Sequence, residues 1–249
     1  MTSKPLKLNL VLGHKGRFEA LFDGRVKPEG IELDVSVTPF NDLFREVPQR
    51  DDFDVAELSG SSYLMTKDRG LPIDAIPVFP HRRFRHGFIF INTKKGIKSP
   101  KDLIGKKIGV KSYQVSAILW LRGILEHEYG VPHKSCEWFS EIDEDVEFIP
   151  PADLKLTRLP DDKYVEKMLV SGELDAVLHP DLIDPMLEGN PNVARLFPDY
   201  KNEEIAYYKK TQIFPIMHVM GIRNSIVEKY PWVPVELYKA FNAAKAIGM

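Results

Sequence analysis

The segment Pro80-His81-Arg82-Arg83-Phe84-Arg85-His86 places three arginines and two histidines within six consecutive positions. A guanidinium group presents paired N–H donors that match the geometry of a carboxylate or a phosphate. If a strand begins at Arg85, Arg85 and Gly87 share one face and His86 lies on the other. The cluster would then divide, with only part of it facing one anionic ligand. A solvated basic turn ahead of a strand is the alternative interpretation.

Serines gather in Ser59-Gly60-Ser61-Ser62, between an expected strand at 53–58 and an expected helix that ends near residue 70. Backbone N–H groups at the start of a helix favour anions, and serine hydroxyls add donors. Ser59, Ser61 and Ser62 are therefore candidate ligands for an anion. An ordinary helix cap needs the same residues and is the alternative.

Three further histidines lie where strands are expected to end or to cross. His14 follows the strand at 6–12, and ligands of open α/β sheets bind at such carboxyl ends. Its ordinary pKa suits it to general acid or base chemistry, although a solvated loop histidine fits as well. His179 ends a strand at 174–178, and His218 lies in an apolar crossing segment, where a hydrogen-bonded core histidine is the alternative.

Tyr113 and Gln114 open the strongest predicted helix, residues 112–129, where their donors could meet a ligand. Gly130 is the expected C-terminal stop of that helix.

Known cofactor and metal patterns are missing from the sequence. It has no phosphate-loop spacing, no His-Glu-x-x-His, no Cys-x-x-Cys and no Gly-x-Ser-x-Gly. No metal ligands and no cofactor are therefore predicted, while a divalent metal ion is left open.

Composition narrows the class of protein. The 249 residues carry 34 basic and 36 acidic side chains, a net charge of −2, which argues against nucleic acid as a partner. No apolar run is long enough for a membrane span, and the start resembles no signal peptide, so we expect a cytoplasmic protein. The single cysteine fits a reducing compartment. No motif reports a partner protein or an oligomeric state.

The elements that must position these residues alternate between strands and helices. Strands are expected at 6–12, 31–37, 53–58, 73–79, 85–92, 106–110, 174–178 and 211–223, and helices at 41–47, 59–70, 112–129, 164–170 and 230–247. This alternation predicts an α/β protein with mainly parallel sheets.

Strand-like crossings near 87–92 and 211–219 predict two lobes. We expect residues 1–90 with 213–249 to form lobe 1 and residues 91–212 to form lobe 2, with a ligand cleft between them.

Several segments together resemble the 4,5-dihydroxyphthalate decarboxylase family, over nearly the whole chain. They are Lys27-Pro28-Glu29-Gly30-Ile31, Phe53 to Ser59, Ile76 to His86, Pro100 to Val110, Trp120 to Leu125, Phe214-Pro215-Ile216-Met217-His218 and Tyr230-Pro231-Trp232-Val233. The resemblance implies a two-lobed, periplasmic-binding-protein-like (type II) fold with two crossing strands between the lobes. Residues 141–159 do not resemble the corresponding part of that family.

The resemblance also implies a carboxy-lyase of aromatic catabolism acting on a small anionic aromatic substrate without an organic cofactor. In that reading, Arg82 and Arg85 bind carboxylate with help from the serine turn, and Tyr113, Gln114 and His179 add contacts. His14, His86 or His218 would supply a proton to the ring.

Two other functions remain open at this point. A non-catalytic solute-binding protein for a small organic anion would use the same scaffold, and so would a biosynthetic enzyme acting on another carboxylate. Histidines with perturbed titration at the ligand would favour catalysis.

Overall fold

The computed structural model describes residues 4–13, 16–38 and 52–248, which form an α/β protein with two separate sheets. The α/β class expected from the sequence is therefore confirmed. The expected helix at 41–47 lies outside the described residues. Among the described residues, no helix is both long enough and apolar enough to cross a membrane.

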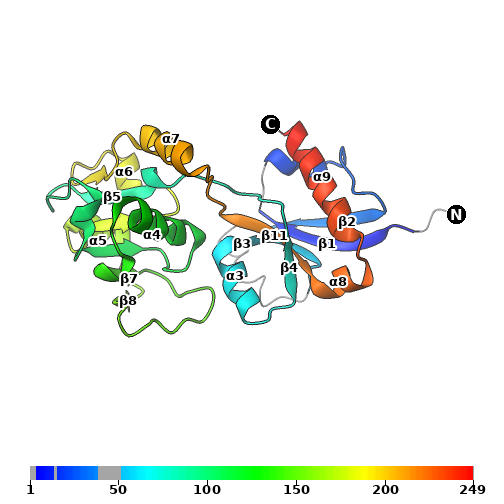
Figure 1. Ribbon diagram of the computed structural model, residues 1–249, viewed down its shortest axis with the longest axis horizontal. Helices are drawn as coiled ribbons and strands as arrows, with labels where there is room; N and C mark the ends of the chain where they lie inside the picture. Colours follow the sequence, from blue (N-terminus) through cyan, green and yellow to red (C-terminus); the bar gives the residue numbers. More distant parts are fainter. Residues whose placement is uncertain (1–3, 14–15, 39–51, 249) are drawn as a thin grey trace. The chain divides into compact units, whose positions relative to one another are not determined.

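The chain divides into two compact units (Figure 1). The first consists of residues 1–82 and 216–249, and the second of residues 83–215. These boundaries differ by a few residues from those expected after residues 90 and 212. The reason is that β5 (Ile89–Asn92) pairs with strands of the second sheet.

The two chain segments that connect the units run side by side. Arg82 and Ile216 form an isolated antiparallel bridge, and the Arg83 N–H donates to the carbonyl of Pro215 at 3.1 Å.

The first unit contains a five-stranded sheet with the order β2-β1-β3-β11-β4. Its strands are β1 (Leu6–Leu12), β2 (Ile31–Val37), β3 (Val55–Ser59), β4 (Ile73–Ile76) and β11 (His218–Arg223). β11 runs antiparallel to both of its neighbours, while β1 is parallel to β2 and β3. The sheet is thus mainly parallel, with one late strand inserted in the opposite direction.

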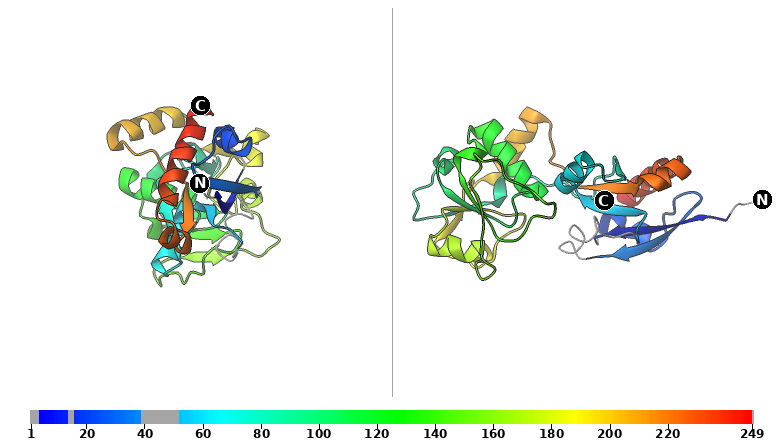
Figure 2. Two further views of the ribbon diagram at one scale, coloured as in Figure 1. Left: turned by 90° about the vertical axis from the view of Figure 1, so that its right-hand side faces the viewer. Right: turned by 90° about the horizontal axis from the view of Figure 1, so that it is seen from below.

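Helices cover both faces of this sheet. They are α1 (Glu19–Phe22), α3 (Gly60–Asp68), α8 (Asn224–Lys229) and α9 (Val233–Ile247). α9 lies along one face (Figures 1 and 2), and its buried Phe241 meets Phe18 edge to face at 5.1 Å between ring centroids. On the other face, Tyr63 of α3 packs with Val11 and Leu58. Successive β1 residues point to opposite faces, so Leu10 and Leu12 pack in the α9 cluster.

The second unit contains a six-stranded sheet with the order β10-β5-β9-β6-β7-β8. Besides β5, its strands are β6 (Lys107–Val110), β7 (Glu137–Ser140), β8 (Leu156–Arg158), β9 (Ala176–Leu178) and β10 (Val193–Arg195). β9, β6, β7 and β8 are parallel, and β5 is antiparallel to β9 and β10.

The helices of the second unit are α4 (Ser116–Tyr129), α5 (Val165–Ser171), α6 (Asp184–Leu187) and α7 (Tyr200–Thr211). α4 ends as expected, at Gly130 with φ 67°, the left-handed region that glycine adopts without a Cβ clash. α7 escaped the sequence analysis because only Tyr207 of its twelve residues is buried, so it shows no apolar periodicity.

Two expected strands are shorter than predicted. The segment 211–223 becomes a strand only at His218, because Thr211 ends α7 and residues 212–217 connect the two elements. The segment 85–92 becomes a strand only at Ile89, because His86–Phe88 form a 3₁₀ turn. The predicted alternation of Arg85 and His86 across a strand is therefore wrong.

Candidate functional site

A buried carboxylate and a histidine form a close pair on β3 and β11, two neighbouring inner strands of the first sheet. Glu57 lies in the middle of β3 and is 0% exposed. Nδ1 of His218 donates to its Oε1 at 2.5 Å, and the Gly13 N–H donates to its Oε2 at 3.1 Å. The antiparallel register, with His218 opposite Ser59, brings the two side chains together across 161 residues of sequence.

His81 joins this pair from the chain that follows β4. Its ring meets the His218 ring edge to face, with 4.9 Å between centroids and 74° between planes. Its carbonyl accepts the N–H groups of Met217 at 2.8 Å and of His218 at 3.2 Å. Glu57, His81 and His218 therefore form one cluster, called here the Glu57 cluster.

The serine turn borders the Glu57 cluster. Ser59 and Ser61 are buried, and their hydroxyl oxygens lie 3.2 Å apart. Ser59 takes the N-cap position of α3, yet its side chain makes no capping hydrogen bond. The ordinary-cap alternative is thus not how this serine is used. Ser62 is buried too, and its hydroxyl has no hydrogen-bond partner among the described residues.

Strand register gathers a second set of residues at one edge of the second sheet. Ile89, Leu178, Val110 and Ser140 form one row across β5, β9, β6 and β7. The segments next to this row lie at the same edge, and they carry Arg85, His179, Tyr113, Gln114 and the connection from β7 to β8. This is the carboxyl end of the parallel strands, the usual ligand-binding edge of α/β sheets.

Arg85 is a buried cation at this edge. Only 2% of it is exposed, and its Nη1 donates to the carbonyl of Pro180 at 2.6 Å. Burial lowers the pKa of Arg85 to about 10, with the nearby Arg83 acting in the same direction. The guanidinium therefore remains charged at neutral pH in an environment that favours an anion beside it.

Tyr113 and Gln114 begin the loop that leads into α4, and both are buried. Their N–H groups donate to the two carboxylate oxygens of Glu144, at 2.7 and 2.8 Å. The guanidinium of Arg122 lies 3.6 Å from the centroid of the Tyr113 ring.

His86 lies among aromatic side chains of the second unit. It is 1% exposed, and its ring packs against Tyr129, Phe197 and Tyr207 at centroid distances of 5.4 to 6.1 Å. Neither ring nitrogen has a hydrogen-bond partner among the described residues. Burial lowers the pKa of His86 to about 4, so the ring is neutral at pH 7.

The other predicted site residues are His179, Arg82 and His14. His179 accepts the Asp181 N–H on Nδ1 at 3.1 Å and so closes a local turn. Arg82 takes part in the bridge to Ile216. His14 lies outside the described residues.

The structure therefore brings His218, Ser59 and Ser61 together in the first unit. It gathers Arg85, Tyr113, Gln114 and His179 at one edge of the second. Sequence reasoning missed Glu57, His81 as a cluster member and Glu144. A signal for Glu57 was present, because it is the one charged residue of the otherwise apolar segment Val55 to Leu58.

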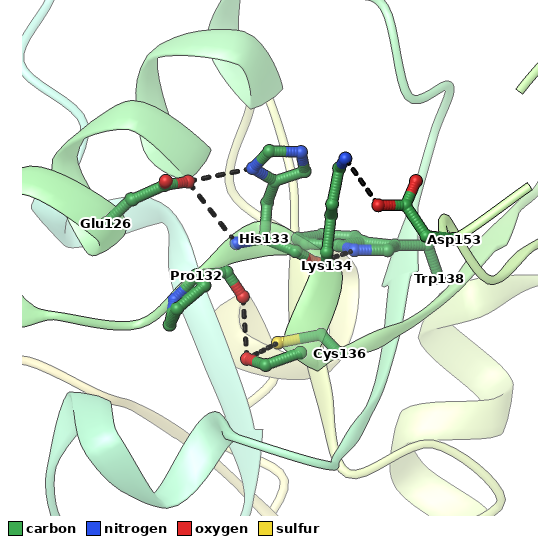
Figure 3. Close-up of polar contacts among 8 residues, drawn as sticks. Glu126, Pro132, His133, Lys134, Cys136, Trp138 and Asp153 are labelled. Atoms are coloured by element: carbon green, nitrogen blue, oxygen red, sulfur yellow. Dashed lines mark hydrogen bonds and ion pairs between the residues drawn. The ribbon is translucent and has the colours of Figure 1, made fainter. Parts of the chain in front are cut away.

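A second histidine–carboxylate pair lies at the opposite edge of the second sheet and provides a contrast (Figure 3). Glu126 of α4 accepts from Nδ1 of His133 at 2.8 Å, just ahead of β7. Both side chains are about one-third exposed, and the His133 carbonyl accepts from the Trp138 indole at 2.7 Å. This pair ties α4 to the start of β7 and is structural. In the described part of the chain, no three His, Cys, Asp or Glu side chains are grouped to hold a metal ion.

Comparison with known proteins adds both sequence relatives and structural neighbours. A family model described as NMT1/THI5 like matches residues 20–135. The 4,5-dihydroxyphthalate decarboxylase of Comamonas testosteroni is 36% identical over 251 residues, covering 98% of this chain and 76% of that protein. The protein of the same name from Pseudomonas putida is 34% identical over 211 residues, covering 82% of each.

Solved structures show the fold. The periplasmic aliphatic sulphonate binding protein SsuA from Escherichia coli matches 98% of this chain and 74% of its own, with a TM-score of 0.59 and 16% identity. A putative periplasmic sulfonate-binding protein SsuA from Methylobacillus flagellatus KT matches 97% and 68%, with a TM-score of 0.60 and 14% identity. The expected periplasmic-binding-protein-like fold of type II is thereby confirmed. With identity above 30% across most of both sequences, the chain belongs to the 4,5-dihydroxyphthalate decarboxylase family.

Proposed function

We propose that this protein is a carboxy-lyase that removes one carboxylate from a small aromatic dicarboxylate of the 4,5-dihydroxyphthalate type. The observation that carries the proposal is the contact between His218 and the fully buried Glu57. A carboxylate held against Nδ1 orients an imidazole and stabilises its protonated form, as a general acid requires. The decarboxylase relatives supply the reaction class.

The reaction needs one proton and no redox partner. Nε2 of the His218 imidazolium gives its proton to the ring carbon that bears the departing carboxylate, and a ring hydroxyl stabilises the resulting cation. The bond between that carbon and the carboxylate then breaks. Its electron pair restores the aromatic ring, and carbon dioxide leaves. The neutral imidazole regains a proton from solvent, so the net reaction consumes one proton for each carbon dioxide released.

Other side chains would bind the substrate. Arg85 offers a buried cation to a carboxylate, which a guanidinium fork matches in shape and charge. Ser59 and Ser61 offer hydroxyl donors beside the Glu57 cluster. His81 lies against the catalytic ring, so it would contribute to the shape and charge of the same place. Arg82, His179 and the Tyr113–Gln114 loop keep their predicted roles as substrate contacts.

A non-catalytic solute-binding protein is the second candidate, and the structural neighbours favour it. The two functions differ in whether His218 must donate a proton. A binding protein needs no proton donor, so replacing His218 would change affinity alone.

The test is release of carbon dioxide from 4,5-dihydroxyphthalate by the wild type, His218→Gln and His133→Gln. We expect release by the wild type, a loss of about 100-fold or more in His218→Gln, and little change in His133→Gln. His133→Gln is a matched control because His133 also bonds a glutamate through Nδ1. Binding of the compound by the wild type without release would overturn the proposal in favour of the solute-binding function.

A further inference from the structure

Glu144 places its carboxylate on two consecutive backbone N–H groups. Tyr113 donates to Oε1 at 2.7 Å and Gln114 donates to Oε2 at 2.8 Å, in the loop between β6 and α4. Adjacent N–H groups that point to one place ahead of a helix are a common anion-binding arrangement. The loop thus holds a carboxylate, and in this structure the chain itself supplies it.

Glu144 comes from the long connection between β7 and β8, residues 141–155. No strand or helix lies within this connection, and it exposes an apolar side chain, Ile149, at 87%. Beside Glu144, Val146 is buried and Phe148 stacks on Tyr113 at 6.2 Å between ring centroids, so the connection packs on the loop itself. The Gln114 side chain accepts the N–H of Val146 on Oε1 at 3.4 Å.

The loop and its surroundings also contain buried N–H donors that do not bond to Glu144. Nε2 of Gln114 is buried and has no hydrogen-bond partner among the described residues. Nε of Arg122 is likewise buried without one, and its guanidinium stacks on Tyr113. A buried donor without a partner destabilises the protein until a partner binds to it.

The carboxylate of Glu144 is also not fully stabilised in this place. Burial raises the pKa of its carboxyl group, and the hydrogen bonds from Tyr113 and Gln114 offset this only in part. The carboxylate is therefore less stable here than in water, and a free carboxylate of better fit would compete with it.

We infer that the loop from Ser112 to Ser116 is a carboxylate-binding site, and that Glu144 occupies it as an internal competitor that a substrate carboxylate displaces. The inference rests on the proposed function for the class of ligand, a small aromatic dicarboxylate. The connection from β7 to β8 must then move away from the loop when that ligand binds. Removing the competitor raises the fraction of open sites and so strengthens binding.

The test is calorimetric titration with phthalate of the wild type, Glu144→Gln and Asp143→Asn. Phthalate has both carboxylates and lacks the ring hydroxyls. Glu144→Gln turns one acceptor toward the loop into an NH₂ donor, which opposes the backbone N–H groups. We expect phthalate to bind Glu144→Gln about tenfold more tightly than the wild type, a difference of about 1.4 kcal/mol.

Asp143→Asn is the matched control, because it removes the same charge one residue away. Asp143 instead accepts from Nε of Arg158 at 2.9 Å. Its affinity for phthalate should stay within about twofold of the wild type. Equal or weaker binding by Glu144→Gln would overturn the inference, and so would an absence of phthalate binding in all three proteins.

A second measurement uses the wild type alone and does not depend on the variant folding. Saturating phthalate should raise the rate of amide hydrogen exchange in residues 141–148 as the connection is released. Unchanged or slower exchange there would contradict displacement. Both readouts report binding and not turnover. A wild type that binds phthalate as expected but releases no carbon dioxide from 4,5-dihydroxyphthalate would refute the proposed reaction and leave this inference standing.

Discussion

Nδ1 of His218 lies 2.5 Å from Oε1 of Glu57, and this contact joins the first residue of β11 to the middle of β3. The carboxylate is fully buried, so bulk solvent does not stabilise its charge. A buried carboxylate of this kind is best satisfied by a cation and by donors, and it has both in His218 and the Gly13 N–H. Both oxygens of the Glu57 carboxylate thus accept a hydrogen bond, one of them from the ring that donates the proton in the proposed reaction.

Glu57→Gln should reduce carbon dioxide release by about 100-fold or more, because an amide cannot stabilise the imidazolium of His218. The limb of the pH–rate profile that reports loss of the His218 proton should also move to lower pH, since the neighbouring negative charge is gone. Steady-state kinetics between pH 5 and 9 would measure both effects. Glu126→Gln removes the corresponding carboxylate of the His133 pair and should change neither. A Glu57→Gln profile of unaltered shape would show that Glu57 acts only in folding.

Arg85→Lys should raise the dissociation constant for phthalate by about tenfold, because an ammonium group cannot bind a carboxylate through two parallel N–H donors. The pKa of Arg85 is about 10, so wild-type affinity should be constant from pH 6 to 9 and fall as the pH approaches 10. Titration calorimetry across this range would test the expectation. Arg83→Lys is the control, since Arg83 is 40% exposed and pairs with Asp181 at 3.4 Å. An equal effect of both variants would argue against a specific role for Arg85.

His86 should make the protein sensitive to acid. Its pKa is about 4 in the folded protein against 6.5 ordinarily, so the unfolded chain takes up a proton first as the pH falls. The stability is complete above pH 6.5 and is lost progressively between pH 6.5 and 4, by about 3 kcal/mol in total from this group.

His86→Phe should remove that loss, because the ring cannot be protonated and fits among Tyr129, Phe197 and Tyr207. Urea unfolding at pH 5 and pH 7.5 would compare the two proteins. We expect the difference in unfolding free energy between these pH values to be smaller by about 2 kcal/mol in the variant. The same pH dependence in both proteins would show that His86 does not titrate in this range. A loss of carbon dioxide release by a stable His86→Phe protein would support the prediction that His86 is a catalytic residue.

Glu126→Gln should lower the free energy of unfolding at pH 7 by less than about 1 kcal/mol, because partly exposed ion pairs contribute little. The hydrogen bond from His133 lowers the pKa of Glu126, so the contribution exists above its ordinary pKa and disappears as the pH falls below it. Denaturant unfolding at pH 7 and pH 4 would show a smaller difference at pH 4, because the contribution is lost only as the pH falls through the lowered pKa. A larger effect at pH 7 would mean that the contact in Figure 3 fixes the junction of α4 and β7 more strongly than its exposure suggests.

The local elements could be read from the sequence where the apolar pattern is strong. The strands at 6–12 and 31–37 and the helix that ends at Gly130 agree with the structure, because alternation, helical spacing and a left-handed glycine are properties of neighbouring residues. The residue types of the arginine-rich segment and the serine turn indicate anion binding, and this stays a prediction. α7 could not be found this way, since its surface is polar on nearly every side.

What the tertiary structure decided is which of these residues meet. Glu57 and His218 are 161 residues apart, and only the insertion of β11 between β3 and β4 makes them partners. Glu144 reaches Tyr113 and Gln114 only because β6 and β7 are neighbours in one sheet. His86 has the right chemistry for catalysis, but a 3₁₀ turn directs it among aromatic rings. Residue type and spacing fix local conformation, whereas pairing between distant strands depends on the burial of whole faces, and that is settled only when the complete sheet forms.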